Sequence, residues 1–384
     1  MRRNITKALA PVGELGIESR EGRFIVKVDG DPVEAGRRLA TVFGVAWYSE
    51  ASFVEANYET IRTAVLALAR GVAGNTFMID ARRADKSFPL SSLELAKMLG
   101  AEVVSVTGKK VRLSEPDSRI HVDVLKEKAL VYSNKTRGPG GLPVGTAGRV
   151  MHLFSGGIDS PVAAWLMMKR GCRPIYLHFY LAPTPDYAIG SKITGLVRVL
   201  SQYSGKSTLV LIPFAEYQIA TAGVPGDLEP SLFRRFMRVT AEFLAAGFKA
   251  SAVSTGDCLS QAASQTLWNM GSFDEGSTLP VLRPLLTYDK EEVIELGRRI
   301  KTYDLSIEEY RDCCAIVTKH PKTRAKKALI NEYSQRLEFP SLARKSAESG
   351  TLLAYSPKTD EFKVVPMKGV LDSYERSSAI ELEL

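Results

Sequence analysis

Residues 155–160 have the composition of a loop that binds an anion. They read Ser-Gly-Gly-Ile-Asp-Ser and follow an apolar run, Val150 to Phe154, that is typical of a buried parallel strand. Gly156 and Gly157 let the backbone approach a bound group closely. The N–H groups and dipole of a following helix would converge on the same point, so the stretch predicts a phosphate site. An ordinary turn rich in Gly and Ser is the alternative.

A helix is expected directly after this loop. Ser160 can cap it, and Pro161 suits its first position, where no N–H donor is needed. Residues 162–169 continue the helix, and Gly171 fits a left-handed stop. The stretch contains neither Gly-x-x-x-x-Gly-Lys-Ser/Thr nor Gly-x-Gly-x-x-Gly, so it matches neither a Walker A loop nor a dinucleotide fingerprint.

Asp159 places a carboxylate inside this predicted phosphate loop. A carboxylate repels an anion unless a cation bridges the two, which indicates Mg²⁺ held at Asp159. The loop also has no lysine of its own and needs a positive charge from elsewhere, for which Lys290 is a candidate. Lys290 can instead pair with Glu291 or Glu295.

Strands and helices alternate from residue 150 onwards. This alternation predicts a doubly wound parallel sheet, in which ligands bind beyond the carboxyl ends of the strands. The loop 155–160, His178 and Gly256 all fall at such ends. The further strands are expected over 174–179, 209–214, 250–255 and 281–285, and the helices around 197–200 and over 232–246, 261–268 and 290–300.

The residues before the loop predict two small α+β units, 1–50 and 51–133. Residues 134–149 hold too much Gly and Pro for a regular element and form a linker, so the third unit is 150–384. Residues 331–384 predict a helix and a hairpin-like tail. In the first two units, strands are expected over 24–28, 45–48, 75–81, 103–106, 111–113 and 120–124, and helices over 32–41, 54–69 and 92–99.

The basic excess of the chain lies ahead of the phosphate loop. The net charge is +8, of which residues 1–150 carry +6 and residues 151–384 carry +2. This distribution favours an N-terminal part that meets a polyanion, although a merely solvated basic surface has the same charge. Arg82, Arg83 and Lys86 follow a predicted strand and are candidates for phosphate contacts, while Phe88 beside them is expected to pack.

Length and composition indicate a soluble protein of two or three domains. The chain has 384 residues, 45% of them hydrophobic and 24% charged. Its four cysteines do not form a disulfide scaffold and suit a reducing cytoplasm. Neither a signal peptide nor a membrane span is recognisable. We therefore expect a cytoplasmic protein without membrane contact.

Several motifs together resemble one enzyme family. Residues 81–92 look like part of a THUMP domain, a module of tRNA-modifying enzymes, and 155–160 look like the loop of ATP pyrophosphatases. With residues 141–145, 255–265, 281–290 and 312–314, the chain resembles tRNA 4-thiouridine synthetases. The resemblance implies an α/β protein with N-terminal ferredoxin-like and THUMP domains followed by an ATP pyrophosphatase domain. It also implies ATP-dependent activation of uridine 8 of tRNA, followed by sulfur insertion.

The resemblance also assigns roles to individual residues. Asp159, Lys290 and Cys313 match the loop aspartate, the lysine and the cysteine needed for the reaction. Local alternatives remain, because His178 can be a satisfied core histidine, Arg234 part of a solvated helix face and Gln265 a local cap. The matched nucleotide contacts are Leu153, Phe154, Ser155, Gly156, Gly157, Ser160, His178, Phe179, Arg234, Gly256 and Gln265.

The sulfur source differs from that of some family members. No cysteine follows Cys314, so the rhodanese domain that some members carry is not expected, and sulfur would come from a cysteine desulfurase or another persulfide donor. Cys313 would carry the persulfide itself or form a disulfide with Cys258 or Cys172. A 2-thiouridine or lysidine synthetase and a non-catalytic tRNA-binding protein are the alternative functions. We expect a homodimer.

Overall fold

The computed structural model of the chain describes residues 1–311, 313 and 322–371. These residues form two compact units, 1–140 and 141–384. No helix in the described ranges is both long and apolar enough to cross a bilayer.

The first unit begins with a small ferredoxin-like α+β part. Asp31 accepts a hydrogen bond from the Val33 N–H and caps a helix whose first residue is Pro32. Buried Ile5, Leu9 and other apolar side chains join the helices to a hairpin. The elements are α1 (Arg2–Leu9), β1 (Leu15–Arg20), β2 (Arg23–Val28) and α2 (Pro32–Leu39), and β3 (Trp47–Tyr48) pairs with β9 (Thr136–Arg137).

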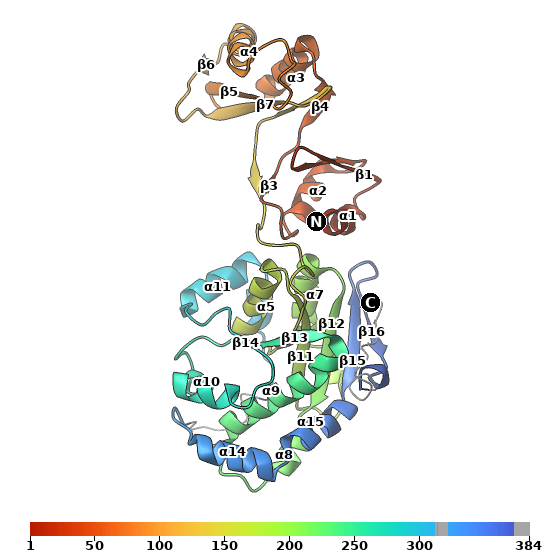
Figure 1. Ribbon diagram of the computed structural model, residues 1–384, viewed down its shortest axis with the longest axis vertical. Helices are drawn as coiled ribbons and strands as arrows, with labels where there is room; N and C mark the ends of the chain where they lie inside the picture. Colours follow the sequence, from red (N-terminus) through yellow and green to blue (C-terminus); the bar gives the residue numbers. More distant parts are fainter. Residues whose placement is uncertain (312, 314–321, 372–384) are drawn as a thin grey trace. The chain divides into compact units, whose positions relative to one another are not determined.

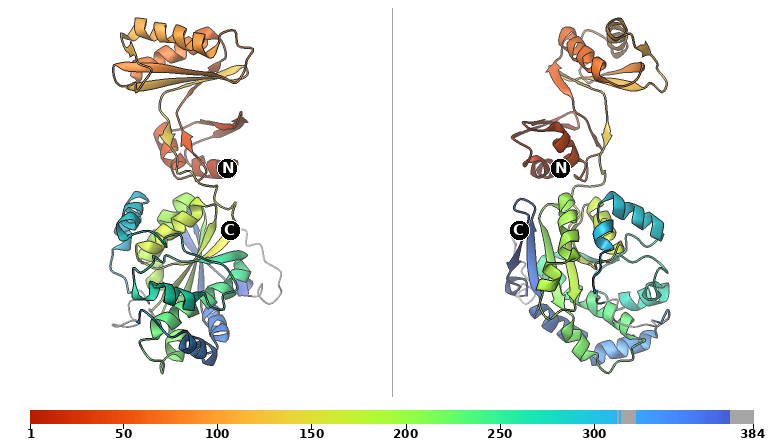
Figure 2. Two further views of the ribbon diagram at one scale, coloured as in Figure 1. Left: turned by 60° about the vertical axis from the view of Figure 1, so that its left-hand side comes forward. Right: turned by 180° about the vertical axis from the view of Figure 1, so that it is seen from behind.

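The THUMP part of this unit is a sheet with two helices on one face (Figure 2). Asn57 caps α3, and a reciprocal pair of hydrogen bonds between Ser91 and Glu94 caps α4. The strand order is β4-β8-β7-β5-β6. Its elements are β4 (Ser52–Glu55), α3 (Tyr58–Gly71), β5 (Thr76–Arg83), α4 (Ser92–Thr107), β6 (Lys110–Val111), β7 (Ser118–Val124) and β8 (Lys128–Tyr132).

Two expectations for the THUMP part were wrong. The helix expected over 54–69 begins only at Tyr58, because residues 52–55 pair with β8 as a strand and Asn57 caps the helix at its start. The strand expected over 103–106 belongs to α4, which runs on to Thr107. Val103 is fully buried in the core of this part, so packing on the sheet outweighs the strand preference of its valines.

The second unit is built on a mixed sheet in the order β14-β13-β10-β11-β12-β15-β16 (Figure 1). The first five of these strands are parallel to one another, and β15 and β16 add to β12 as an antiparallel hairpin. The strands are β10 (Arg149–Leu153), β11 (Arg173–Tyr180), β12 (Ser207–Pro213), β13 (Ala250–Ser254), β14 (Val281–Leu282), β15 (Thr351–Ser356) and β16 (Glu361–Val365).

Helices cover the sheet of this unit, and the long α9 contributes many of its buried apolar side chains. The helices are α5 (Asp159–Lys169), α6 (Asp186–Ile189), α7 (Lys192–Ser204), α8 (Ala215–Ala220), α9 (Glu229–Phe248), the 3₁₀ turn η1 (Ala263–Gln265), α10 (Leu267–Asp274), α11 (Lys290–Arg299), α12 (Tyr303–Ser306), α14 (Lys327–Arg336) and α15 (Phe339–Glu348). Parallel strands with alternating helices confirm the predicted fold class.

Details of the second unit differ from expectation at two places. Helix α5 begins at Asp159 with Ile158 before it, so Ser160 does not cap the helix and Pro161 is not its first residue. Residues 261–268 are not one helix but the turn η1 followed by the start of α10. Gly171 has the expected left-handed conformation, with φ of 86°.

Candidate functional site

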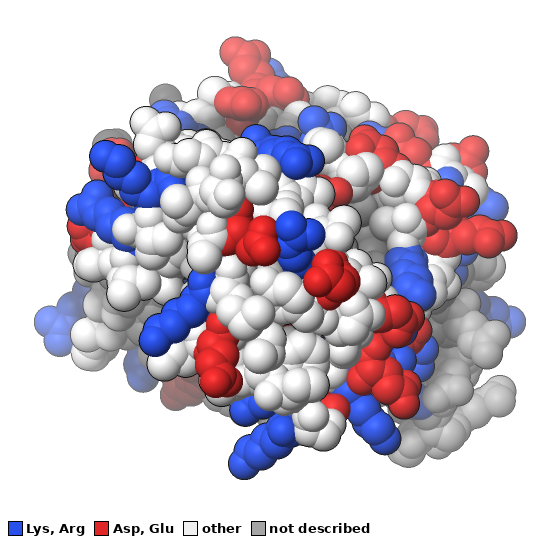
Figure 3. Space-filling model, turned by 90° about the horizontal axis from the view of Figure 1, so that it is seen from above, with Lys and Arg blue, Asp and Glu red and all other residues white. Residues whose placement is uncertain are grey.

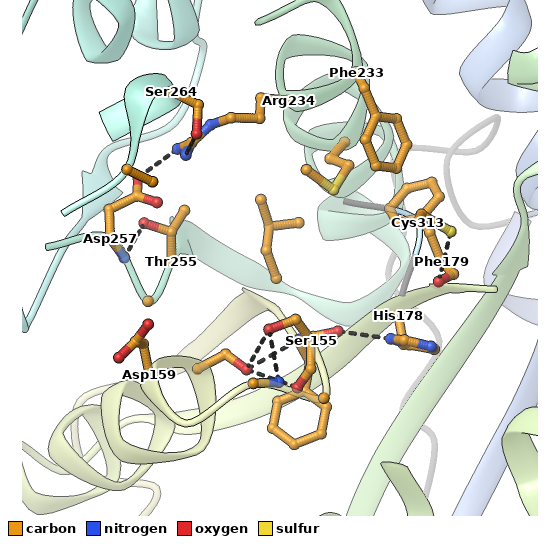
Figure 4. Close-up of a pocket in the computed structure, with 18 of the residues that line it drawn as sticks. Ser155, Asp159, His178, Phe179, Phe233, Arg234, Thr255, Asp257, Ser264 and Cys313 are labelled. Atoms are coloured by element: carbon orange, nitrogen blue, oxygen red, sulfur yellow. Dashed lines mark hydrogen bonds and ion pairs between the residues drawn. The ribbon is translucent and has the colours of Figure 1, made fainter. Parts of the chain in front are cut away.

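A cavity of about 600 Å³ lies where β10, β11 and β13 end (Figure 4). This volume is in the range of ligand pockets and large enough for a nucleotide. Most of the predicted site residues line it: Leu153, Phe154, Ser155, Gly156, Gly157, Asp159, Ser160, His178, Phe179, Arg234, Gly256, Gln265 and Cys313. Lys290 is not among the lining residues, but its Nζ lies 2.9 Å from the Asp159 carboxylate.

The loop 155–160 is closed by hydrogen bonds between its first and last residues. Ser160 Oγ accepts from the Ser155 N–H at 3.0 Å and donates to the Ser155 carbonyl at 2.9 Å. A Cβ on Gly256 would lie 2.8 Å from the Ser160 nitrogen, so the end of β13 approaches this turn as only a glycine can. Ser160 therefore shapes the loop from within, a role that its predicted cap position did not include.

A buried histidine, His152, contacts the last residue of the loop through a hydrogen bond. His152 Nε2 lies 2.9 Å from the Ser160 carbonyl and Nδ1 lies 2.8 Å from Ser254 Oγ. The carbonyl needs a donor, so Nε2 carries the hydrogen and Nδ1 accepts from the serine hydroxyl. Burial lowers the pKa of His152 to about 4, more than the hydrogen bond to Ser160 raises it, so the ring is neutral at pH 7.

Asp159 connects two elements that are distant in the sequence. Its Oδ1 lies 2.9 Å from the Nζ atom of Lys290, which is the first residue of α11. Its Oδ2 accepts a hydrogen bond from Gln261 Nε2 at 3.1 Å. Lys290 thus pairs with the loop carboxylate.

Arg234 belongs to a buried ion cluster at one side of the cavity. Its Nη2 lies 2.6 Å from Asp257 Oδ2, which Arg283 Nε also contacts at 3.2 Å. Burial raises the pKa of Asp257, but the two guanidinium groups outweigh it and hold the pKa below its usual value. Both guanidinium groups also lie over the Phe273 ring. Arg234 is therefore fixed in the pocket wall rather than part of a solvated helix face.

Sequence reasoning missed Asp257 and Arg283 as part of the site. Both fall inside motifs that were recognised, and Asp257 directly follows the end of β13. A carboxylate at the end of a buried strand needs a cationic partner. The sequence therefore indicates that Asp257 has a cationic partner, but it does not show which arginines these are.

His178 takes part in a hydrogen-bond chain at another wall of the cavity. Nδ1 lies 2.8 Å from the Phe154 carbonyl, and Nε2 lies 2.8 Å from Tyr310 Oη. The carbonyl accepts from Nδ1, which therefore carries a hydrogen. The Tyr310 ring stacks on Tyr187, which is 47% exposed. His178 is thus a satisfied, buried histidine that also lines the pocket.

Cys313 lies in the wall of the same cavity and is 1% exposed. Its Sγ donates to the Phe179 carbonyl at 3.1 Å (Figure 4). A thiolate has no proton to donate, so it could not make this hydrogen bond. Activation of Cys313 therefore requires that it leaves this carbonyl. Cys314, the neighbouring cysteine, lies outside the described residues.

Gln265 leaves one polar atom in the pocket wall without a protein partner. Its Oε1 is buried and makes no hydrogen bond to any described residue, although Gln265 N–H is bonded locally to the Ala262 carbonyl. A buried amide oxygen of this kind is an acceptor for a ligand N–H group.

No ready-made metal cage is present in the described ranges, where no three His, Cys, Asp or Glu side chains are grouped to hold an ion. Asp159 alone suits Mg²⁺, because this ion is usually bound by one or two carboxylates together with substrate phosphates and water. The residues present thus fit a metal that arrives with a nucleotide.

The predicted RNA-contact residues differ in their exposure and in their hydrogen bonds to the protein. Arg82 is exposed and pairs with Asp80 at 3.3 Å, and Lys86 is exposed as well. Arg83 Nη1 instead donates to the Phe88 carbonyl at 2.8 Å, and Phe88 is buried as expected. The part of the unit that carries α3 and α4 shows acidic and basic side chains interspersed rather than a continuous basic face (Figure 3).

An aromatic ladder that the sequence did not reveal lies near Arg82. The ring of Tyr132 stacks between His121, at 4.9 Å, and Trp47, at 5.8 Å. Lys135 Nζ lies 4.9 Å from the centroid of the Trp47 ring, which is 43% exposed. An exposed aromatic ring beside a cation is the kind of surface on which unpaired bases stack in nucleic-acid-binding proteins.

The fold and this pocket define an ATP pyrophosphatase domain that follows ferredoxin-like and THUMP domains. The models of the families described as "Thiamine biosynthesis protein (ThiI)", "THUMP domain" and "ThiI ferredoxin-like domain" match residues 145–339, 55–134 and 1–49. The chain belongs to the tRNA sulfurtransferase family and is an enzyme.

Relatives match over nearly the whole chain. A probable tRNA sulfurtransferase of Moorella thermoacetica is 39% identical over 360 residues, which are 93% of this chain and 92% of the relative. One of Geobacillus kaustophilus is 38% identical over 371 residues, with coverage of 94% and 92%. The crystal structure of a 4-thiouridine synthetase–RNA complex with bound ATP has a TM-score of 0.84, 30% identity and coverage of 92% and 93%.

Proposed function

We propose that this enzyme converts uridine 8 of tRNA to 4-thiouridine in two steps. In the first, uridine O4 attacks the α-phosphate of ATP and pyrophosphate leaves. In the second, a sulfur nucleophile adds at C4 and AMP leaves, carrying O4 with it. Adenylation makes this possible because it converts a poor leaving oxygen into a good one.

One observation carries this proposal: a single cavity is lined by a phosphate loop, an aspartate paired with a lysine, and a cysteine thiol. ATP would place its phosphates at residues 155–160, where backbone N–H groups and the start of α5 favour an anion. The base would lie beside Leu153, Phe154, His178 and Phe179, and the free acceptor of Gln265 would take an N–H group. The resemblance to a 4-thiouridine synthetase with bound ATP supports ATP as the ligand of this domain.

Asp159 and Lys290 would act on the phosphates. Asp159 would hold Mg²⁺, which when bound neutralises phosphate charge, and Lys290 keeps the carboxylate oriented from 2.9 Å away. Neither residue is needed for RNA binding alone, so the pair favours an enzyme that activates its substrate.

Cys313 would deliver sulfur by one of two routes. It can carry the persulfide, whose outer sulfur displaces AMP at C4; a second thiol then attacks Cys313 Sγ, and 4-thiouridine leaves as a disulfide forms. Alternatively, Cys313 attacks the sulfur-bearing cysteine of a donor persulfide, which forms a mixed disulfide and releases HS⁻ to attack C4. Burial and nearby Asp159 raise the pKa of Cys258 to about 11, which makes Cys258 a poor second thiol in the first route.

A reconstituted reaction tests the function. Purified protein, ATP, Mg²⁺, unmodified tRNA and a persulfide-loaded cysteine desulfurase would be combined, and nucleosides would be analysed by mass and absorbance. We expect one 4-thiouridine per tRNA, one pyrophosphate released per nucleoside formed, and no product from tRNA with cytidine at position 8. A 2-thiouridine or lysidine product, or binding without turnover, would contradict the proposal.

The same proposal includes the sulfur donor, the oligomeric state and the location of the enzyme. The persulfide donor is a cysteine desulfurase or a carrier loaded by one, and the enzyme acts as a homodimer in the cytoplasm. Sedimentation equilibrium of the purified chain measures the mass of the assembly, for which we expect twice the 42.1 kDa of one chain.

A further inference from the structure

A second lysine lies at the opposite end of the phosphate loop from Asp159. Lys192 is the first residue of α7. Ser191 caps this helix, because its side chain accepts a hydrogen bond from the Ile193 N–H. Its side chain lines the same cavity as the loop. The ammonium group is held in place because Nζ donates to the Ser306 carbonyl at 2.8 Å and to the Glu308 carbonyl at 2.7 Å.

The side chain of Lys192 crosses directly over the first glycine of the loop. A Cβ on Gly156 would lie 2.6 Å from Lys192 Cε and 3.4 Å from Nζ. Any larger residue at this position would displace the lysine. The absence of a side chain at Gly156 thus brings an ammonium group against the backbone that is built to receive phosphate.

We propose that Lys192 is a phosphate-positioning residue of this enzyme. Its ammonium group would contact the ATP phosphates at the Gly156 end of the loop. Because this inference rests on the proposed binding of ATP, it deepens that function by naming a residue that discriminates a triphosphate from an uncharged nucleoside.

The charges around the loop support this role. Lys290 Nζ is 2.9 Å from the Asp159 carboxylate, and Arg234 is 2.6 Å from Asp257, so both of these cations are balanced by acids inside the protein. ATP brings several negative charges to a loop that contains a carboxylate, and these need cations at more than one point. The hydrogen bonds from Lys192 to the Ser306 and Glu308 carbonyls orient its ammonium group beside the loop.

Binding of ATP and adenosine to Lys192→Met tests the proposal. Calorimetric titrations would compare the wild type, Lys192→Met, Lys192→Arg and the control Lys206→Met. Lys206 is an exposed lysine just beyond the C-terminal end of α7 and outside the cavity. We expect Lys192→Met to bind ATP roughly 10- to 100-fold more weakly, the range of a lost charge-assisted hydrogen bond, with adenosine affinity nearly unchanged. Lys192→Arg keeps the charge and should retain most of the preference for ATP.

The outcomes separate this inference from the proposed function. If the wild type fails to prefer ATP over adenosine, the proposed ATP site itself is wrong. If the wild type prefers ATP and Lys192→Met does so equally, the lysine does not contact phosphate. An equal loss of affinity for both ligands would show that Lys192 only fastens residues 306–308, and would also overturn the inference.

Discussion

The carboxylate of Asp159 and the ammonium group of Lys290 meet at 2.9 Å although 131 positions separate them. Each begins a helix, Asp159 in α5 and Lys290 in α11. Asp159 lines the cavity whereas Lys290 does not, and their side chains are 22% and 43% exposed. Solvent screens such a pair, so its contribution to stability is small, at about 1 kcal/mol or less. The pair therefore matters little for folding, and its place at the phosphate loop indicates a role in the chemistry.

Asp159→Asn should therefore separate activity from folding and from RNA binding. We expect pyrophosphate release to fall by at least about 100-fold, the scale of a lost electrostatic contact at a reacting phosphate. The thermal midpoint and tRNA affinity should stay close to those of the wild type. Release assays and filter binding on one preparation measure all three, and normal pyrophosphate release would refute the assignment. Lys290→Met should behave alike, and the double variant should lose little more than either single one.

Arg82→Ala should weaken tRNA binding and reduce its dependence on salt. Arg82 is exposed, whereas Arg83 is bonded to the Phe88 carbonyl, so a single substitution at Arg82 avoids a structural effect. Each phosphate contact that is lost should lower the slope of log affinity against log salt by about 0.9. Lys97→Ala, on the exposed face of α4, is the matched control. An unchanged slope for Arg82→Ala would show that this arginine only pairs with Asp80.

Cys313→Ser should block thiolation but not adenylation. A serine can still donate to the Phe179 carbonyl as the thiol does at 3.1 Å, so the fold should be kept. In a single turnover with ATP, tRNA and a persulfide donor, we expect pyrophosphate at the wild-type rate and no 4-thiouridine. Cys172→Ser, at a partly exposed cysteine, serves for comparison. Thiouridine formed by Cys313→Ser at the wild-type rate would assign the sulfur chemistry to the donor alone.

His152 should make the second unit less stable in mild acid. Its pKa is about 4 in the folded protein and ordinarily 6.5, so between these values the unfolded chain binds the extra proton. Stability is then fully present above pH 6.5 and falls as the pH drops towards 4, by up to about 3 kcal/mol. Urea denaturation at a series of pH values measures this. In His152→Gln the decline over this window should be smaller, and an identical decline would locate the titration elsewhere.

Local sequence patterns predicted most elements but not the contacts between them. The run Val150 to Phe154 and the alternation after it define the parallel sheet, and Gly171 ends α5 with the expected left-handed backbone. Prediction failed where packing decides, as at Val103, whose β-branched neighbours favour a strand locally while its burial against the sheet keeps it helical.

The residues that line the site were also more predictable than the contacts between their side chains. The residue types of the phosphate loop already indicated an anion site, and the cavity gathers them as expected. No pattern links Arg283 to Asp257 or Lys192 to Gly156, because these contacts depend on how separate helices and strands pack. Ser160 shows the same limit: its hydroxyl fits a helix cap by type, yet it bonds Ser155 instead.

The hairpin of β15 and β16 moves the border of the large sheet away from the strands that build the nucleotide pocket. Without it, β12 would present a row of unpaired backbone groups flanked by buried apolar side chains, the kind of border through which proteins aggregate. With it, the outermost strand at this side among the described residues is β16, which is short and carries the exposed charges of Glu361 and Lys363. Residues 351–365 thus cover the edge of β12 and hinder edge-to-edge aggregation, although they do not line the cavity.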